Sequence, residues 1–477
     1  MTTCSMKTMK RLVTFILALV FAAAAHAQKE QPLPKDLPSY GPQPALQLPD
    51  VRASRLDNGL TVWLVAQPGL PKISFSIAVL GGLANDPANR PGMSELLSRT
   101  ITQGTKTRGA KQIAEEIQAA GGDLNADANR DRTVISTSVL SSKGEAAVSL
   151  LADVLENASF PDNEVTLAKS NLSESLRERE AQPGFQANRA LARVLFGTGP
   201  YSVISPTQDS VAQMNAAELR QEYARRFRPD QALLVAVGDF DPARMSALIR
   251  DKLAGWKAPA TSPATVNAKP AVPAPHSAYF VARPHSVQTT LVLAAFGPLR
   301  GDPDYEAAEV ANAVYGGTFS SRLVANIRED KGYTYSPGSG VQTLRQAGIV
   351  RTQADVRNAV TGASLNEIDY ELNRMVTTSP TEEELSRAKR FLLGIEAISL
   401  QSRDSVAAEL ASLWLNGLPP DGISTYGKKV NAATPEDVDA AAKKYWPASR
   451  MTIVAVGEEK VIREALAPFG LPVEAVK

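Results

Sequence analysis

Two kinds of hydrophobic pattern alternate along the chain from residue 51 onward. Apolar residues recur at every second position over Ile73–Val79, which predicts a strand, and a second strand is predicted over Thr133–Leu140. The pair Asn58-Gly59, between two strand-like runs, predicts a hairpin turn. Strand-like and helical patterns in the same chain predict an α+β fold that combines a sheet with helices. The predicted helices cover residues 92–103, 111–120, 143–157 and 162–180, where apolar residues recur at helical spacing.

The same landmarks occur twice in the sequence. Asp86-Pro87 recurs as Asp302-Pro303, 216 positions later, and Val235–Gly238 recurs as Val454–Gly457, 219 positions later. A residue suited to begin a helix stands 20 positions before each of the two Val-Ala-Val-Gly runs. Before the first run it is Asn215, which Glu218 follows three positions later, and before the second it is Thr434, which Pro435 follows directly. The repetition predicts two homologous halves, each a sheet with helices.

Composition divides the chain into segments. Residues 258–276 are crowded with Pro, Ala and Thr, a composition that favours an extended linker over a packed core. We therefore predict an N-terminal domain over residues 51–257 and a C-terminal domain over residues 277–477. Residues 28–50 are rich in Pro and Gln and are predicted to form an extended leader.

The first 27 residues have the order of a secretory signal peptide. Basic residues precede an apolar run from Leu12 to Ala25, and Ala25-His26-Ala27 matches the small-residue cleavage pattern. Cleavage is expected after Ala27, which predicts a periplasmic or secreted protein. No later run approaches the roughly 20 apolar residues that a membrane span requires.

Charge and cysteine content exclude several classes of function. Lys and Arg number 51 against 50 Asp and Glu, so no global field favours nucleic acid as a partner. Cys4, the single cysteine, lies within the predicted signal peptide, so the mature chain has no thiol for a disulfide, a metal ligand or a nucleophile.

The most informative motif runs from Gly316 to Tyr335, with the sequence GGTFSSRLVANIREDKGYTY. On spacing alone it could be a glycine turn, a surface arginine and two packing tyrosines. Over its whole length it resembles the C-terminal half of the M16 (pitrilysin/insulinase-like) zinc peptidases, notably the bacterial two-subunit branch. The resemblance implies two α+β halves that face each other like a clamshell, and it implies that Arg328 and Tyr335 hold the substrate near a zinc site.

The zinc motif of that family is not intact in this chain. Active members carry H-x-x-E-H on one helix and a further Glu ligand downstream. Gly92 and Gly104-Thr105 match the flanking positions of the motif. The resemblance places Glu95, Ser98 and Arg99 at the first His, the general base and the second His, and Ser175 at the downstream ligand, with Glu174 as a possible misaligned ligand. No cofactor is therefore expected in this chain.

Glu95 and Arg99 are four residues apart on a predicted helix, which is the favourable orientation for an ion pair. The alternative is an ordinary solvated helix face. Two histidines, His276 and His285, remain after the predicted cleavage, and a surface or turn role is expected for both.

The resemblance implies a non-catalytic subunit that binds peptide and pairs with a homologous H-x-x-E-H subunit, where the zinc is expected. An alternative is a scaffold or peptide-binding protein with no catalytic partner. A third interpretation, an enzyme with other chemistry, has less support, because the sequence has no nucleophile elbow, no mature cysteine and no histidine near a suitable base.

Overall fold

The computed structural model describes residues 50–263, 265–270 and 276–476. The predicted signal peptide, its cleavage point and residues 28–49 of the predicted leader lie outside the described residues.

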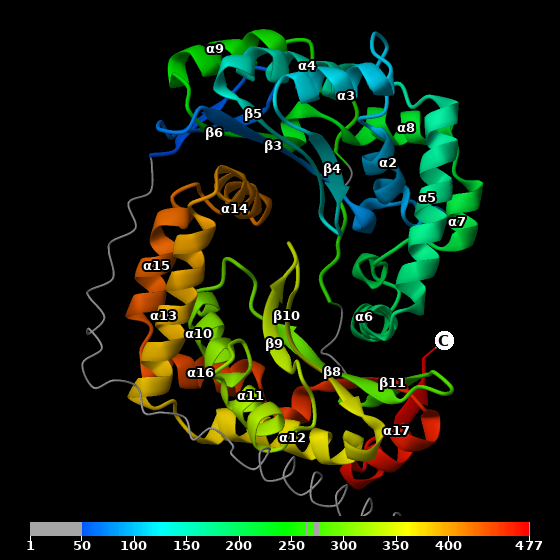
Figure 1. Cartoon of the computed structure of the whole chain (residues 1–477), viewed down its shortest axis with the longest axis vertical. Helices are drawn as coiled ribbons and strands as arrows, with labels where there is room; N and C mark the ends of the chain where they lie inside the picture. The colour runs from blue at the N-terminus through cyan, green and yellow to red at the C-terminus, as the bar shows by residue number, and fades with distance from the viewer. Residues whose placement is uncertain (1–49, 264, 271–275, 477) are drawn as a thin grey trace, which may run out of the picture. The chain divides into compact units, whose positions relative to one another are not determined.

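The first half is built on a six-stranded mixed sheet (Figure 1). Its order is β1-β2-β6-β3-β5-β4, and β2 and β6 are the parallel neighbours in an otherwise antiparallel sheet. β6 reads Ala-Leu-Leu-Val-Ala-Val-Gly and is buried along its whole length, because it lies inside the sheet with both faces covered. The strands are β1 (Arg52–Arg55), β2 (Thr61–Ala66), β3 (Lys72–Leu80), β4 (Leu124–Ala128), β5 (Arg132–Leu140) and β6 (Ala232–Gly238).

The second half repeats this topology. Its order is β12-β7-β11-β8-β10-β9, so β7, β11, β8, β10 and β9 take the places of β2, β6, β3, β5 and β4. The predicted α+β fold with two similar halves is confirmed, and the repeated Val-Ala-Val-Gly runs are the equivalent strands β6 and β11. The strands are β7 (Ala278–Ala282), β8 (Gln288–Gly297), β9 (Gly338–Thr343), β10 (Gly348–Arg357), β11 (Thr452–Gly457) and β12 (Val473–Ala475).

Helices cover both faces of each sheet. In the first half they are α2 (Met93–Thr100), α3 (Ala110–Ala119), α4 (Gly144–Asn157), α5 (Asp162–Ala181), α6 (Pro183–Phe196), α7 (Gln208–Gln213), α8 (Ala216–Arg226) and α9 (Pro242–Lys252). In the second half they are α10 (Tyr305–Tyr315), α11 (Arg322–Val324), α12 (Thr361–Thr377), α13 (Glu382–Ser399), α14 (Arg403–Leu415), α15 (Gly422–Ala432), α16 (Pro435–Tyr445) and α17 (Glu459–Leu466).

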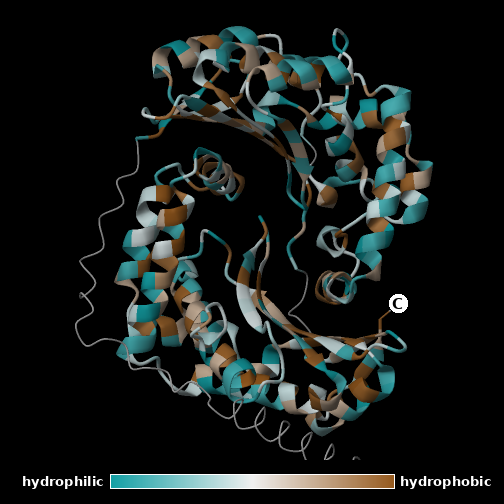
Figure 2. Ribbon diagram, in the orientation of Figure 1, coloured by the Kyte–Doolittle hydropathy of each residue, from teal (hydrophilic) through white to brown (hydrophobic). Residues whose placement is uncertain are grey.

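The predicted helix starts are confirmed in both halves. Asn215 caps α8 and forms a reciprocal capping box with Glu218, while Thr434 caps α16, in which Pro435 is the first residue. Figure 2 shows hydrophobic residues concentrated along the strands, whereas helices such as α5 and α13 carry both hydrophobic and hydrophilic residues. In α5, for example, the buried residues Val165, Leu172 and Leu176 form an apolar side that faces neighbouring helices.

The two halves exchange one helix each. From the second half, α14 packs Leu410 and Leu413 against strands of the first sheet such as β6. From the first half, α6 packs Leu191 and Leu195 against β8 and β11 of the second sheet. Figure 1 shows α14 against the first sheet and α6 against the second. The halves are thus joined through two hydrophobic clusters as well as through the chain itself.

The segment between α9 and β7 contains no helix or strand among its described residues. It is held by hydrogen bonds from both halves: Arg228 donates to the carbonyl oxygen of Thr261 at 2.6 Å, and the side chain of Gln346 accepts from the amide of Ala268 at 3.0 Å. No helix of the described residues is long and apolar enough to cross a membrane.

Candidate functional site

The helix that carries the altered zinc motif, α2, is anchored at its N-terminus by Asp86. The Asp86 carboxylate accepts hydrogen bonds from the amides of Gly92 and Ser94 at 2.8 and 3.0 Å, and from the Ser94 hydroxyl at 2.5 Å. The two amides are among the backbone donors that a helix leaves without intrahelical partners at its start. Gly92 adopts a left-handed conformation, with φ of 87°. The recurrent Asp-Pro landmark therefore fixes where α2 begins.

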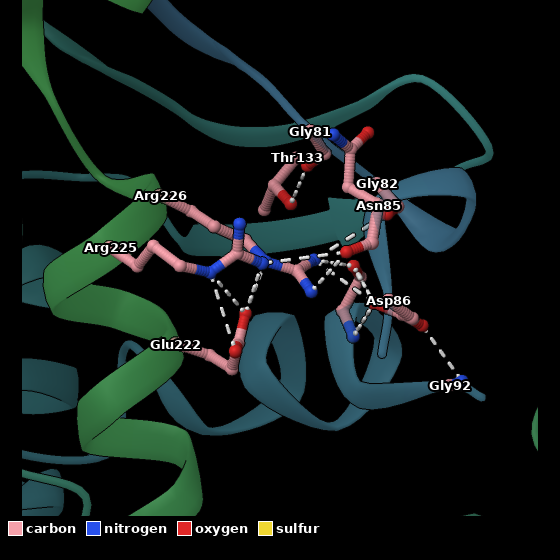
Figure 3. A network of polar contacts seen from close by, with 10 residues as sticks. Gly81, Gly82, Asn85, Asp86, Gly92, Thr133, Glu222, Arg225 and Arg226 are labelled. Carbon is pink, nitrogen blue, oxygen red and sulfur yellow. Dashed lines mark hydrogen bonds and ion pairs between the residues drawn. The ribbon is translucent and has the colours of Figure 1, made fainter. Parts of the chain in front are cut away.

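A buried ion-pair network holds Asp86 in turn (Figure 3). Arg226 of α8 donates to the carboxylates of Asp86 at 3.0 Å and Glu222 at 2.7 Å. Burial raises the pKa of Asp86, while the charge of Arg226 and the hydrogen bonds from Ser94 act in the opposite direction. The network ties the start of α2 to α8.

The predicted ion pair on α2 is confirmed. Arg99 contacts the Oε1 atom of Glu95 at 3.2 Å, and Arg179 of α5 donates to the same oxygen at 2.9 Å. Ser98 is buried, and its hydroxyl donates to the backbone carbonyl of Glu95 at 2.9 Å. Sequence reasoning missed Arg179, since the contact joins residues 84 positions apart.

The downstream positions of the motif lie on α5. Glu174 is exposed and pairs with Arg177 at 2.5 Å, so it is directed to a surface ion pair. Ser175 is partly buried. Neither residue lines the cavity beside Glu95.

That cavity has a volume of about 540 Å³ and opens beside α2. It is bordered by Glu95, Ser98 and Arg99 from α2, by Arg179 from α5, and by residues from Ala126 in β4 to Arg130. Figure 1 shows α2 between β4 and α5. Three arginines therefore surround the position that the resemblance assigns to a metal.

Zinc does not fit this donor set. One oxygen of Glu95 is already shared by two guanidinium groups, and the Ser98 hydroxyl is bonded to the backbone. Among the described residues, no group of three or more His, Cys, Asp and Glu side chains is placed to hold a metal ion. Structural and catalytic zinc sites use at least three such side chains as ligands, so we derive no metal chemistry for this cavity.

A larger cavity, of about 670 Å³, lies near Tyr201. Arg226 and Arg228 line it, but their guanidinium groups are already paired with Asp86 and Asp230. Its charged groups are largely committed to structural contacts, which makes it the weaker candidate.

The second predicted element, Arg328 with Tyr335, forms a stacked cluster at the surface. The Arg328 guanidinium carbon lies 4.8 Å from the ring centre of Tyr335 and 4.9 Å from that of Phe319. Its Nε also contacts Glu329 at 3.2 Å. The two rings are 80% and 77% exposed, so the interpretation of Tyr335 as a core packing residue is wrong. Phe319 was missed, although it stands in the same motif.

The local backbone explains how this cluster is presented. α11 continues into a π-helical turn, Ala325–Asp330, and Gly332 follows it with φ of 62°, a left-handed conformation that glycine adopts readily. The Thr334 hydroxyl then donates to the Asp355 carbonyl at 2.6 Å, which pins the segment beside β10. Within the part of the chain that the structure describes, the Tyr335 hydroxyl has no hydrogen-bond partner.

The structure brings Arg328 and Tyr335 together but does not bring them to Glu95. No residue from 316 to 335 borders the cavity beside α2. The two histidines have the expected roles: His285 lies in an exposed turn with φ of 65°, and His276 contacts the Met451 carbonyl at 3.1 Å.

Two family profiles match the chain in sequence order. Residues 61–202 match the insulinase family, peptidase family M16, and residues 213–392 match the peptidase M16 inactive domain. The two matches cover much of each structural half.

The chain is similar to curated proteins that are called uncharacterized zinc proteases. It is 27% identical to one from Mycobacterium leprae over 395 residues, which cover 81% of this chain and 87% of that protein. It is 26% identical to YmxG of Bacillus subtilis over 357 residues, which cover 73% and 84% of the two chains.

Solved structures superpose on most of the chain. A peptidase M16 inactive domain from Pseudomonas fluorescens gives a TM-score of 0.80 at 26% identity, over 86% of this chain and 98% of that one. A protease from Helicobacter pylori also gives 0.80, at 18% identity over 86% and 100%, which supports the fold alone. With both profiles in order and the repeated sheet topology, the chain belongs to the M16 peptidase family.

Proposed function

We propose that this chain is an exported, non-catalytic M16 subunit that binds peptide and positions it for a partner subunit carrying an H-x-x-E-H zinc site. The proposal includes export to the periplasm or beyond by the signal peptide of residues 1–27. The observation that carries it is the surface cluster in which Arg328 contacts the exposed rings of both Phe319 and Tyr335.

Stacking prepares Arg328 to bind a peptide. Contact with two aromatic rings restricts the Arg328 guanidinium, while its N–H groups can still donate hydrogen bonds. Those N–H groups can donate to a peptide carbonyl or carboxylate. The hydroxyl of Tyr335, whose ring belongs to the same cluster, can donate to an oxygen that becomes negative during peptide hydrolysis.

The proposal includes a partner because the described residues offer no group of three or more His, Cys, Asp and Glu side chains that could hold zinc. The cavity at the motif position is bordered by arginines, and Arg328 does not border it. In the proposed assembly Arg328 and Tyr335 act across the interface, at the zinc site of the partner.

Zinc content tests the first part of the proposal. The purified mature chain is expected to retain no stoichiometric zinc after dialysis against micromolar zinc, measured by elemental analysis. One zinc retained per chain would overturn the assignment and direct attention to Glu174 and the two histidines.

Co-expression with an H-x-x-E-H homologue from the same compartment tests the assembly. The two chains are expected to elute together on size exclusion as a stable complex. Such a complex should bury about 1,600 Å² or more at its interface. Separate elution at micromolar concentration would favour a scaffold or peptide-binding protein with no catalytic partner.

Tyr335→Phe tests the active-site role in the reconstituted complex. It removes one hydroxyl and keeps the ring that stacks on Arg328, so a fall in turnover of about 10²–10³ is expected if the hydroxyl stabilises the oxyanion. Tyr370→Phe, at another exposed tyrosine, is the matched control and should leave turnover unchanged. Wild-type turnover in Tyr335→Phe, with the complex intact, would remove the proposed role.

Arg328→Lys is a second variant of the same cluster. Lysine keeps the positive charge but lacks the planar fork for bidentate contact and for stacking on aromatic rings. We expect a higher KM for the peptide in the complex, with the complex itself retained.

A further inference from the structure

The cavity beside α2 has more positive than negative side chains. Arg99, Arg130 and Arg179 border it, against two carboxylates, Glu95 and Asp127. The excess is a single positive charge, which suits a monoanion better than a dianion such as a phosphate monoester.

The guanidinium groups also have hydrogen bonds to spare. Arg99 and Arg179 share one oxygen of Glu95, and the Nε of Arg179 is buried without a partner in the described chain. Because a guanidinium carries five N–H donors, one shared oxygen leaves most of them free for a ligand.

Arg130 is the third source of free donors. The guanidinium carbon of Arg130 lies 5.9 Å from the ring centre of Phe196. Among the described residues, its guanidinium group has no ion pair or hydrogen bond. Its neighbour Asp131 is already used, because its carboxylate accepts hydrogen bonds from the Tyr201 hydroxyl and from the amide of Arg345. Burial lowers the pKa of Arg130, while the charges of Asp131 and Tyr201 act in the opposite direction.

Apolar groups complete the cavity wall. Leu83 and Ile204 border it together with Ala126 and Ala128 of β4. A charged head with an apolar or peptide stem therefore suits it better than a small inorganic ion.

We propose that this cavity binds a carboxylate of a peptide, through Arg99, Arg130 and Arg179. A carboxylate matches the planar fork of arginine and brings the single negative charge that the cavity lacks. The identity of the ligand as a peptide rests on the proposed function. Binding here uses this chain alone and none of the residues of the Arg328 cluster.

The experiment measures fluorescence anisotropy of a short, N-terminally labelled alanine-based peptide on the isolated mature chain. Three peptides are compared: one with a free C-terminus, its C-terminal amide, and the amide with one internal Glu. The free acid, the Glu peptide, or both should bind at least about tenfold tighter than the plain amide, and which of them does so identifies the source of the carboxylate. Equal binding of all three would overturn the proposal.

Variants locate the binding to this cavity. Arg179→Met should abolish the preference, whereas Arg177→Met, on the same helix but exposed and outside the cavity, should preserve it. Circular dichroism melting checks that each variant is folded. A preference that survives Arg179→Met would refute the site.

Glu95→Gln should change the affinity for the carboxylate peptide in the opposite direction. It removes the carboxylate that already occupies Arg99 and Arg179, so the affinity for the carboxylate peptide should rise several-fold. An unchanged or lower affinity in the folded variant would contradict the proposal.

These outcomes separate this proposal from the proposed function. If no partner complex forms but the carboxylate preference follows Arg179 and Glu95, the cavity assignment stands and the subunit role fails. If the complex is active and Tyr335→Phe is impaired, but the three peptides bind equally, the subunit role stands and the cavity assignment fails.

Discussion

Asp86→Ala is expected to be one of the most destabilising single substitutions in the first half. The Asp86 and Arg226 side chains are only 2% and 5% exposed, and their atoms are 3.0 Å apart. The substitution removes the ion pair and three hydrogen bonds that anchor the start of α2. It also leaves Arg226 buried with Glu222 as its remaining carboxylate.

The loss of stability in Asp86→Ala follows from the burial of the Arg226 charge that remains. Removing one partner of a buried pair costs about 3–5 kcal/mol, because the other charge stays desolvated. Replacing both partners avoids that penalty. The double variant Asp86→Ala/Arg226→Met should therefore lose less stability than the sum of the two single variants, by about 0.5–3 kcal/mol.

Urea unfolding followed by tryptophan fluorescence measures these differences, since Trp63 and Trp256 are buried in the first half. Lys111→Met is the control, because its ion pair with Glu115 is 88% and 63% exposed and should contribute less than about 1 kcal/mol. A loss below about 1 kcal/mol in Asp86→Ala, or strictly additive single variants, would refute the argument.

Three further predictions concern pH and backbone geometry. Burial raises the pKa of Glu396 from 4.5 to about 7. The protonated carboxyl should therefore favour the folded state below pH 4.5, and this stabilisation should be lost as the pH rises through 7. In a series of melting temperatures measured against pH, Glu396→Gln should flatten this part of the curve. Hydrogen bonds from Arg322 lower the pKa of Glu384 from 4.5 to about 2. The ionised Glu384 should therefore stabilise the fold above pH 4.5, and this stabilisation should disappear as the pH falls toward 2. Arg322→Met should reduce that loss of melting temperature in acid. Gly92→Ala should lower the melting temperature, because Gly92 has φ of 87° and an added Cβ would lie 2.3 Å from the Cβ of Pro206; an unchanged melting temperature would show that the turn can adjust.

The sequence by itself determined the elements and their repetition. Strands such as β3 and helices such as α5 were predicted near their observed bounds, because the spacing of apolar residues follows local backbone geometry. The starts of α8 and α16 were predicted for the same reason, since a cap acts within one turn of helix. The Glu95–Arg99 pair was predictable because both residues lie on one helix, four positions apart.

Tertiary structure decided which distant groups meet. Arg179 reaches Glu95 from α5, and the ring of Phe319 contacts Arg328 as that of Tyr335 does, although neither contact has a periodic signature. The exchange of α6 and α14 between the two halves was also not predictable, because an apolar helix face shows that a surface will be buried but not which sheet will bury it. Such contacts depend on the packing of the whole chain, and hydrophobic packing is non-directional, so no local pattern specifies the partner.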